Sequence, residues 1–233
     1  MTSGRLRILS GGAAQGLVAA LAPQFQAQTG CEIDGTFGAV GAMRDKLLAG
    51  APADLLILTR ALIAELTAQG HVVAGTATDV GTVLTAIAVR DGDTVPDVGD
   101  AEGLRAALLA ADAISFPDPK LATAGIHFAA VIERLGIAPD VASRIRTFPN
   151  GATAMRELAA MRGGHPIGCT QVTEILNTPG VHLVAPLPPG FELATVYTAG
   201  VCARSALPEE ARALAALLAG PSAQDARARA GFT

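Results

Sequence analysis

Three basic side chains and two proton-transfer groups are the residues of this sequence best suited to chemistry. Arg60 and Lys120 are cationic donors that could pair with a carboxylate. Arg44 lies in the first turn of a predicted helix, where a cation is unfavourable beside the helix dipole. Either a ligand or a surface ion pair with Asp45 or Glu65 would explain its place there. His127 and Glu174 can accept or donate a proton. Together these residue types predict a site for a small anion, which either binds the anion only or also transfers a proton.

Glycine-rich or polar turns between predicted strands and helices are expected to form that site. Ligands of open α/β sheets bind at the carboxyl ends of strands, where the first N–H groups of the following helix are free and favour an anion. The turns are Ser10–Gly16, Gly38–Gly41, Asp118–Gly125, Pro149–Thr153 and Thr170–Glu174. The predicted ligand-binding residues are Gly11, Gly12, Ala13, Ala39, Val40, Arg60, Lys120, Thr123, Ala124, Gly125, Asn150, Gly151, Thr170 and Gln171.

Each candidate also has an ordinary structural interpretation. The first turn is neither GxGxxG nor a Walker loop, so it fits a plain strand–helix connection as well as a ligand site. His127 is either a general base or a packed helical histidine, and Glu174 either an acid–base group or part of a helix first turn. Cys169 is expected to be a buried, inert thiol. Thr123 is expected to cap the helix that carries His127.

The elements that must position these residues alternate between short apolar runs and longer amphipathic runs, which predicts an α/β fold with mostly parallel sheets flanked by helices. The predicted strands are 6–9, 32–37, 54–58, 82–90, 113–116, 145–148, 167–170, 181–185 and 195–203. The predicted helices are 17–29, 42–49, 60–69, 104–111, 125–135, 152–161, 172–176 and 209–219.

The late strand at 195–203 suggests that the chain returns to its first half. We therefore expect two lobes, residues 1–82 plus 196–233 and residues 83–195, joined by two hinge crossings near Thr82–Val83 and Thr195–Val196. The ligand is expected in the cleft between the lobes, which would close over it.

Composition limits the partners. The chain has 233 residues with a net charge of −4 and 3% aromatic residues, so we do not expect nucleic acid as a partner. Its three cysteines and four histidines show no metal-ligand spacing, so neither a metal nor another cofactor is expected. No apolar run is long enough for membrane insertion. The N-terminus has no signal-like core, which predicts a cytoplasmic protein as the sequence stands, or a periplasmic one if a signal was removed.

The turns, in this order, resemble the molybdate-type (ModA-like) solute-binding proteins of the type II periplasmic-binding-protein fold, over nearly the whole chain. The most specific stretches are Gly50–Leu55 and Asp118–Gly125, supported by Gly168–Glu174 and Pro186–Pro188. The resemblance implies an anion-binding protein that works with an ABC transporter if it is exported. Members that bind molybdate place serines in the first two turns, where this chain has Ala13 and either Ala39 or Val40, and a tyrosine where it has Gln171.

The resemblance extends to an aconitate isomerase-like subgroup through Thr170–Ile175. It implies an alternative function, a cytoplasmic and cofactor-independent isomerase of a polycarboxylate, with His127 and Glu174 as candidate bases and Arg60, Lys120 and Arg44 as carboxylate clamps. Three hypotheses thus stay open: a binding protein for a small carboxylate or oxyanion, an isomerase that works by proton transfer, and a regulatory or interaction domain on the same fold.

Overall fold

The computed structural model of the protein describes residues 4–233, which form two compact units. Unit 1 contains the chain up to Val83 and Thr195–Thr233, and unit 2 contains Leu84–Ala194. The chain therefore passes from one unit to the other twice.

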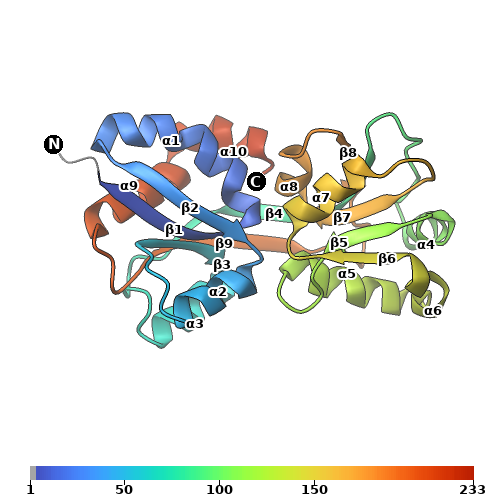
Figure 1. Ribbon diagram of the computed structural model, residues 1–233, viewed down its shortest axis with the longest axis horizontal. Helices are drawn as coiled ribbons and strands as arrows, with labels where there is room; N and C mark the ends of the chain where they lie inside the picture. The colour runs from blue at the N-terminus through green and yellow to red at the C-terminus, as the bar shows by residue number, and fades with distance from the viewer. Residues whose placement is uncertain (1–3) are drawn as a thin grey trace. The chain divides into compact units, whose positions relative to one another are not determined.

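Unit 1 is built on a mixed sheet with the strand order β2-β1-β3-β9. Strands β1 (Arg5–Gly11), β2 (Glu32–Gly38) and β3 (Leu55–Thr59) are parallel, whereas β9 (Ala194–Val201) pairs antiparallel with β3. In Figure 1, helices α1, α9 and α10 lie on one face of this sheet, and α2 and α3 lie on the other. The helices are α1 (Gln15–Thr29), α2 (Val40–Leu48), α3 (Arg60–Ala68), α9 (Pro208–Ala219) and α10 (Gln224–Ala230).

The sequence explains these layers. The apolar run Leu55–Leu58 is wholly buried, as expected for a strand covered by helices on both faces. In α1 the buried residues Leu17, Leu21 and Phe25 recur every four positions and form its inner face. The helix ends at Gly30, whose φ of 72° is left-handed and favours glycine.

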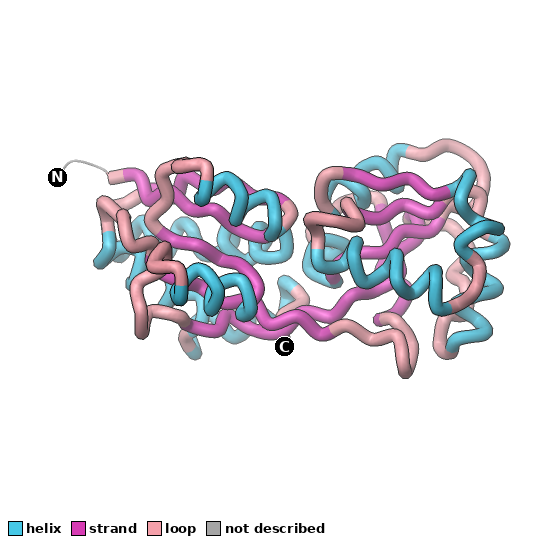
Figure 2. Tube along the Cα trace, turned by 90° about the horizontal axis from the view of Figure 1, so that it is seen from below, coloured by secondary structure: helices cyan, strands magenta, loops and turns pink. Residues whose placement is uncertain are grey.

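Unit 2 has a second mixed sheet with the order β8-β4-β7-β5-β6. Strands β5 (Ile114–Pro117), β6 (Ile145–Phe148) and β7 (Ile167–Gln171) are parallel, and β4 (Thr78–Arg90), which begins in unit 1, runs antiparallel to β7 and to β8 (Val181–Pro186). Figure 2 shows the strands of each unit between layers of helix. The helices of unit 2 are α4 (Ala101–Ala110), α5 (Thr123–Arg134), α6 (Ala138–Val141), α7 (Gly151–Ala160) and α8 (Val172–Leu176).

Two apolar cores lie on the two faces of the unit 2 sheet. One contains Phe116 and Phe128, whose rings meet edge to face with centroids 5.3 Å apart, and it includes residues of α4 and α5. The other contains Ala86, Met155 and Ile175 and lies beneath α7 and α8. Helix α5 follows β5 and helix α7 follows β6, so both begin at the carboxyl edge of these parallel strands although they cover opposite faces of the sheet.

The predicted α/β class with mixed, mostly parallel sheets is confirmed, and each predicted strand and helix is present within a few residues. Among the strands and α-helices of residues 4–233, three features were not predicted. Strand β4 begins at Thr78 rather than residue 82, and the short helices α6 and α10 are additional. Helix α10 buries none of its residues, so it has no apolar periodicity for sequence analysis to detect.

The buried carboxylate of Asp54, just before β3, forms hydrogen bonds with β1 and with the C-terminal part of unit 1. Its Oδ2 accepts the N–H of Arg7 at 2.9 Å, and its Oδ1 accepts the Ser205 hydroxyl at 2.9 Å and the Ala206 N–H at 2.8 Å. The side chain thus satisfies donors from β1 and from the turn that leads into α9.

We predict that Asp54→Ala lowers the free energy of unfolding by roughly 3 kcal/mol or more, because each buried donor left without an acceptor costs about 1–3 kcal/mol. Equilibrium urea denaturation followed by circular dichroism measures the loss. The matched control is Asp45→Ala, which removes an exposed carboxylate paired with Arg44 and should change stability by less than ~0.5 kcal/mol. Equal losses of stability in the two variants would show that the buried Asp54 carboxylate stabilises the fold no more than an exposed one does.

Candidate functional site

In unit 1, strands β1 and β2 end side by side, with Gly11 opposite Gly38 in the parallel register. A Cβ at Gly11 would lie 2.8 Å from Cε1 of Tyr197 and 2.9 Å from Cγ1 of Val40. No side chain larger than hydrogen fits between them. Gly11 therefore lets the turn after β1 approach the only tyrosine of the chain, on β9, and the start of α2.

The helices that begin at this edge have no side-chain cap. A 3-10 turn, Gly12–Ala14, leads into α1 from Gly11, and α2 begins after Ala39. Neither Gly11 nor Ala39 offers a side-chain oxygen, and no side-chain hydrogen bond caps either turn. Ala13 and Ala39 are buried, so the first N–H groups here lie beside methyl groups and not hydroxyls. This edge offers an anion backbone donors but no hydroxyl from Ala13, Ala39 or Val40.

Arg60 follows β3 and forms an ion pair with Asp79. Its Nε lies 3.2 Å from Oδ1 of Asp79, and its NH2 group also donates to that carboxylate. Asp79 accepts the hydroxyl of Thr198 at 2.7 Å as well. The hydrogen bond from Arg60 lowers the pKa of Asp79, with a smaller contribution from Thr198. Arg60 is largely exposed, so its outer face is accessible although its charge is partly neutralised.

Arg44 pairs with its neighbour Asp45, the second of the alternatives that the sequence left open. Both its Nε and its NH2 donate to Oδ1 of Asp45, at 3.0 and 2.8 Å. Both residues are at least partly exposed. The pair explains Arg44 without a ligand.

In unit 2, the turn after β5 brings the start of α5 against the end of that strand. A Cβ at Gly125 would lie 2.2 Å from the carbonyl oxygen of Pro117 and 2.4 Å from that of Asp118. Only glycine permits this approach. The carboxylate of Asp118 organises the turn by accepting the N–H groups of Lys120 and Leu121, at 2.7 and 3.0 Å, and the Lys120 side chain is exposed.

The prediction that Thr123 caps α5 is wrong. The N-cap residue is Ala122, with an extended backbone, and Thr123 is the first residue of the helix. The contact of Gly125 with the carbonyls of Pro117 and Asp118 fixes where the helix starts, which is one residue earlier than if Thr123 were the cap. As a result, no side chain caps α5, and its first N–H groups, beginning with those of Thr123, Ala124 and Gly125, have no intrahelical acceptor.

Helix α7 starts at the same edge, but side chains of the protein accept hydrogen bonds from its first N–H groups. The side chain of Asn150 accepts the N–H of Thr153 at 2.8 Å. The buried carboxylate of Glu174 accepts the N–H groups of Ala152 and Gln171 and, at 2.5 Å, the Thr170 hydroxyl. Burial raises the pKa of Glu174, and these three donors offset part of that rise. Of the two helices, α5 is the one with free donors.

The other candidate for proton transfer, His127, has one nitrogen engaged. Its Nε2 lies 2.7 Å from the carbonyl oxygen of Phe191, which can only accept, so Nε2 carries the proton. The ring is partly buried on α5. Nδ1 is thus the nitrogen that remains for a base.

Cys169 and Gln171 lie inside unit 2. Burial raises the pKa of Cys169 well above its ordinary value, which suits an inert thiol and not a nucleophile. Gln171, the last residue of β7, is buried and its side-chain amide lies 3.5 Å from the hydroxyl of Thr85 on β4.

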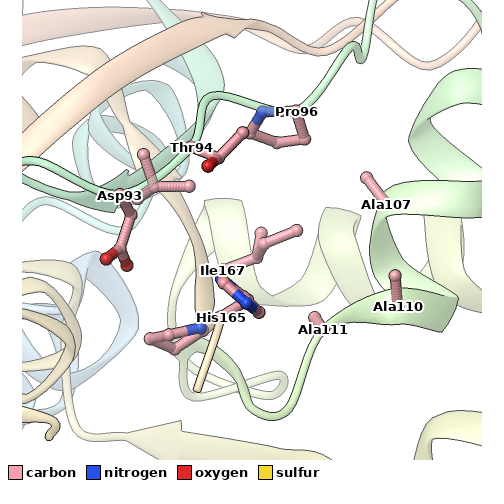
Figure 3. Close-up of a pocket in the computed structure, with 10 residues that line it drawn as sticks. Asp93, Thr94, Pro96, Ala107, Ala110, Ala111, His165 and Ile167 are labelled. Atoms are coloured by element: carbon pink, nitrogen blue, oxygen red, sulfur yellow. The ribbon is translucent and has the colours of Figure 1, made fainter. Parts of the chain in front are cut away.

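A separate pocket in unit 2 contains none of the predicted site residues. It has a volume of about 340 Å³ and lies at the amino edge of β7, where Ile167 begins the strand (Figure 3). Its lining is mostly apolar, with Asp93, Thr94 and His165 as polar members, and Asp93 is paired with Arg90. Other lining residues are Val89, Pro96, Ala107, Ala110, Ala111 and Pro166.

Within residues 4–233, no three histidine, cysteine or acidic side chains gather closely enough to hold a metal ion. Over the same range no helix has both the length and the apolar character needed to cross a membrane.

The structure thus gathers the predicted residues at the carboxyl edges of the two units. In unit 1 these are Gly11, Gly12, Ala13, Ala39, Val40 and Arg60, and in unit 2 Thr123, Ala124, Gly125, Asn150, Gly151, Thr170, Gln171 and Glu174. Sequence analysis missed Tyr197, Asp79 and Thr198. Tyr197 carried a signal, since it is the only tyrosine, whereas nothing marked Asp79 as the partner of Arg60. The location of a ligand between the lobes stays a prediction.

Comparison with known proteins defines the class. Residues 6–233 match the model of the family described as bacterial extracellular solute-binding protein, and the chain belongs to this family. Among curated proteins, an aconitate isomerase from Pseudomonas sp. is 27% identical over 229 residues, which cover 95% of this chain and 84% of the relative.

Solved structures support the fold at lower identity. The periplasmic molybdate-binding protein of Azotobacter vinelandii aligns with a TM-score of 0.79 and 19% identity over 98% of both chains. The sulfate-binding protein SubI of Mycobacterium tuberculosis H37Rv aligns with a TM-score of 0.79 and 20% identity over 98% of this chain and 86% of its own. The expected type II periplasmic-binding-protein fold is confirmed.

We predict that Gly125→Ala destabilises the protein, because the added methyl group meets the carbonyl oxygens of Pro117 and Asp118. Overpacking of this kind costs roughly 2 kcal/mol or more, which exceeds the ~1 kcal/mol that alanine gains over glycine in a helix. Urea denaturation measures the change. In the control Gly99→Ala the added Cβ has an ordinary 3.4 Å contact with Asp97, so its stability should stay near that of the wild type. A fully stable Gly125→Ala variant would show that α5 does not need this glycine.

Proposed function

We propose that this protein binds a small anionic solute, a carboxylate, polycarboxylate or oxyanion, through backbone N–H groups at uncapped helix starts. The observation that carries the proposal is that α1, α2 and α5 all begin at carboxyl edges of parallel strands with no side-chain cap. Such N-termini attract anions through free donors and through the helix dipole. Membership of the solute-binding family, and the anion names of the two similar structures, support it.

The local side chains favour a carboxylate over a tetrahedral oxyanion. Ala13, Ala39 and Val40 provide no hydroxyl, and a lost hydrogen bond to a charged ligand costs about 1.5–3 kcal/mol. Arg60 and Lys120 are exposed cations that can meet a carboxylate as it enters. We therefore rank small carboxylates first among the anions.

The family description supports an exported protein, which would be periplasmic and would deliver its solute to an ABC transporter. One structure of similar fold is the substrate-binding domain of a putative molybdenum ABC transporter from Clostridium difficile, with a TM-score of 0.70 and 15% identity over 99% of both chains. A transporter partner and a periplasmic location are parts of the same proposal.

A thermal-shift panel tests the binding proposal directly. Molybdate, tungstate, sulfate, citrate and the two aconitates are added at millimolar concentration. A ligand present at a hundred times its dissociation constant adds about 2.7 kcal/mol to the stability of the folded state, which gives a clear rise in melting temperature. If none of these anions stabilises the protein, the proposal is wrong.

We further predict that Ala122→Asp blocks the site at α5. Ala122 has the extended backbone of an N-cap residue, so an aspartate there can accept the helix N–H groups that would otherwise face a ligand. Because Ala122 is buried, the cost of burying the new charge offsets the stability that the cap adds, and the variant should lose at least about tenfold in anion affinity. Isothermal titration with the best anion of the panel measures the affinity.

The matched control for this variant is Ala142→Asp, which adds the same charge at an exposed position of unit 2. It should leave anion affinity within about twofold, because exposed charges are largely screened by salt. An equal loss in both variants would mean that net charge, and not the start of α5, governs binding.

A second candidate function is isomerisation of a polycarboxylate, favoured by the similarity to an aconitate isomerase over 95% of the chain. A base would remove a proton from the carbon beside one double-bond carbon and return a proton at the far end of the allylic system, with no net redox change. Glu174, whose pKa burial raises, and Nδ1 of His127 are the candidate bases.

Incubation with cis- and trans-aconitate in deuterated water separates the two functions. The isomerase hypothesis predicts interconversion with deuterium incorporated into the product, which Glu174→Gln or His127→Gln should abolish if the altered residue is the base. Binding without interconversion or deuterium uptake would leave the protein as a binding protein for this ligand.

A further inference from the structure

The carboxylate of Glu174 stands at the start of α7 in the position where a bound anion would be expected. It accepts the backbone N–H groups of Ala152 and Gln171 and the hydroxyl of Thr170, the last at 2.5 Å. The residue is only 7% exposed. A carboxylate with three donors around it, at a helix N-terminus, is bound as an anionic ligand would be.

Gly151 shows that the chain is shaped around this carboxylate. A Cβ at Gly151 would lie 1.9 Å from Oε2 of Glu174 and 2.0 Å from the hydroxyl oxygen of Thr170. The glycine therefore leaves the space that the carboxylate uses. Asn150 accepts a further N–H of the same helix turn, so the first N–H groups of α7 have side-chain acceptors. No side chain accepts the first N–H groups of α5 at the same strand edge.

We propose that Glu174 is the specificity-determining residue of unit 2: as an internal anion at α7 it disfavours ligands that bring two negative charges to this edge and favours those that bring one. The inference rests on the proposed anion binding and deepens it. A second charge placed near a buried carboxylate is repelled through a medium of low dielectric, where charges interact far more strongly than in water. Charge, more than shape, would then separate one anion from another.

The surroundings leave Glu174 as the group that can respond to such a charge. Helix α8 packs against α7, β7 and β8. None of the charged groups on these elements contributes to the raised pKa of Glu174, which burial causes. The other ionisable residues of those elements are Arg156, Glu157, Cys169 and His182. A dianion that does bind should therefore drive a proton onto Glu174, and its affinity should rise as the pH falls.

The test uses pairs of probes that differ in charge: molybdate with perrhenate, which match in shape, and fumarate with its monomethyl ester, which is larger by one methyl group. Isothermal titration gives the affinity of each for the wild type and for Glu174→Gln, which keeps the size of the side chain without its charge. We expect the variant to gain at least tenfold in affinity for the dianion of a pair, and less for the monoanion. Glu157→Gln, which removes an exposed carboxylate from α7, should leave the preference unchanged.

The outcomes separate the inference from the proposed function. Anions that bind both proteins with the same charge preference would overturn the role of Glu174 and leave anion binding intact. If no probe binds either protein, both fail.

The wild type alone provides a second measurement, needed if the variant folds poorly. Between pH 5 and pH 8 its affinity for molybdate or fumarate should fall relative to that for the matched monoanion as the pH rises, with proton uptake on binding. A constant ratio would overturn the inference.

A measurement without ligand tests how costly the charged form of Glu174 is in the folded protein. Because the pKa of Glu174 is raised in the folded protein, its contribution to stability is full below the ordinary value of 4.5 and is lost as the pH rises through the folded-state pKa. The wild type should therefore lose stability relative to Glu174→Gln as the pH rises above 4.5. A constant difference in stability between the two proteins from pH 4 to pH 8 would contradict the raised pKa of Glu174, on which the expected pH dependence of binding rests.

Discussion

The first N–H groups of a helix need acceptors, and the way in which each helix finds them organises this protein. Helices α3 and α4 use their own Thr59 and Asp100, and the turn before α9 uses the buried Asp54. Helix α7 uses Asn150 and Glu174. Helices α1, α2 and α5 have no such acceptor, and they begin where parallel strands end. Stability and binding thus draw on the same backbone groups.

Glycine positions make the uncapped edges possible. Gly11 and Gly125 bring the backbone of a turn so close to a neighbouring side chain or carbonyl that a Cβ would collide, and Gly151 makes room for a carboxylate. None of the three has a left-handed backbone, so the reason for glycine is space and not conformation. At Gly11, which is the N-cap residue of the 3-10 turn before α1, this lack of space excludes a capping side chain, whereas α5 is uncapped because its N-cap residue is Ala122.

Much of the fold could be predicted from the sequence because its signals are local. The buried run Leu55–Leu58 and the four-residue spacing in α1 each specify one element, and the succession of such elements predicts the α/β class. Helix α10 was missed because it has no apolar face. Turns at strand ends were also predictable, since glycine and proline mark them.

The partners of the site residues could not be predicted, because they come from distant parts of the chain. Arg60 meets Asp79, and Asp79 meets Thr198, more than a hundred residues further on. The sequence around Thr123 resembled a helix cap, but the contact of Gly125 with β5 decides the start of α5. Glu174 was identified as an acid–base candidate, yet its place at the start of α7 depends on Gly151 and Thr170.

A fold shared by binding proteins and an isomerase does not by itself decide between them, so the decision rests on the state of the two candidate bases. A base needs a free lone pair within reach of the substrate carbon. His127 has given Nε2 to the carbonyl of Phe191 and retains only Nδ1. The carboxylate of Glu174 is surrounded by three donors, each of which weakens it as a base, while burial strengthens it. One of these donors is the N–H of Ala152 at the start of α7. If Glu174 took up a proton from a substrate, this N–H would face a neutral acid, which is a weaker acceptor than a carboxylate. Binding of a singly charged anion needs no proton transfer to either residue, and binding is the function that the observed hydrogen bonds favour.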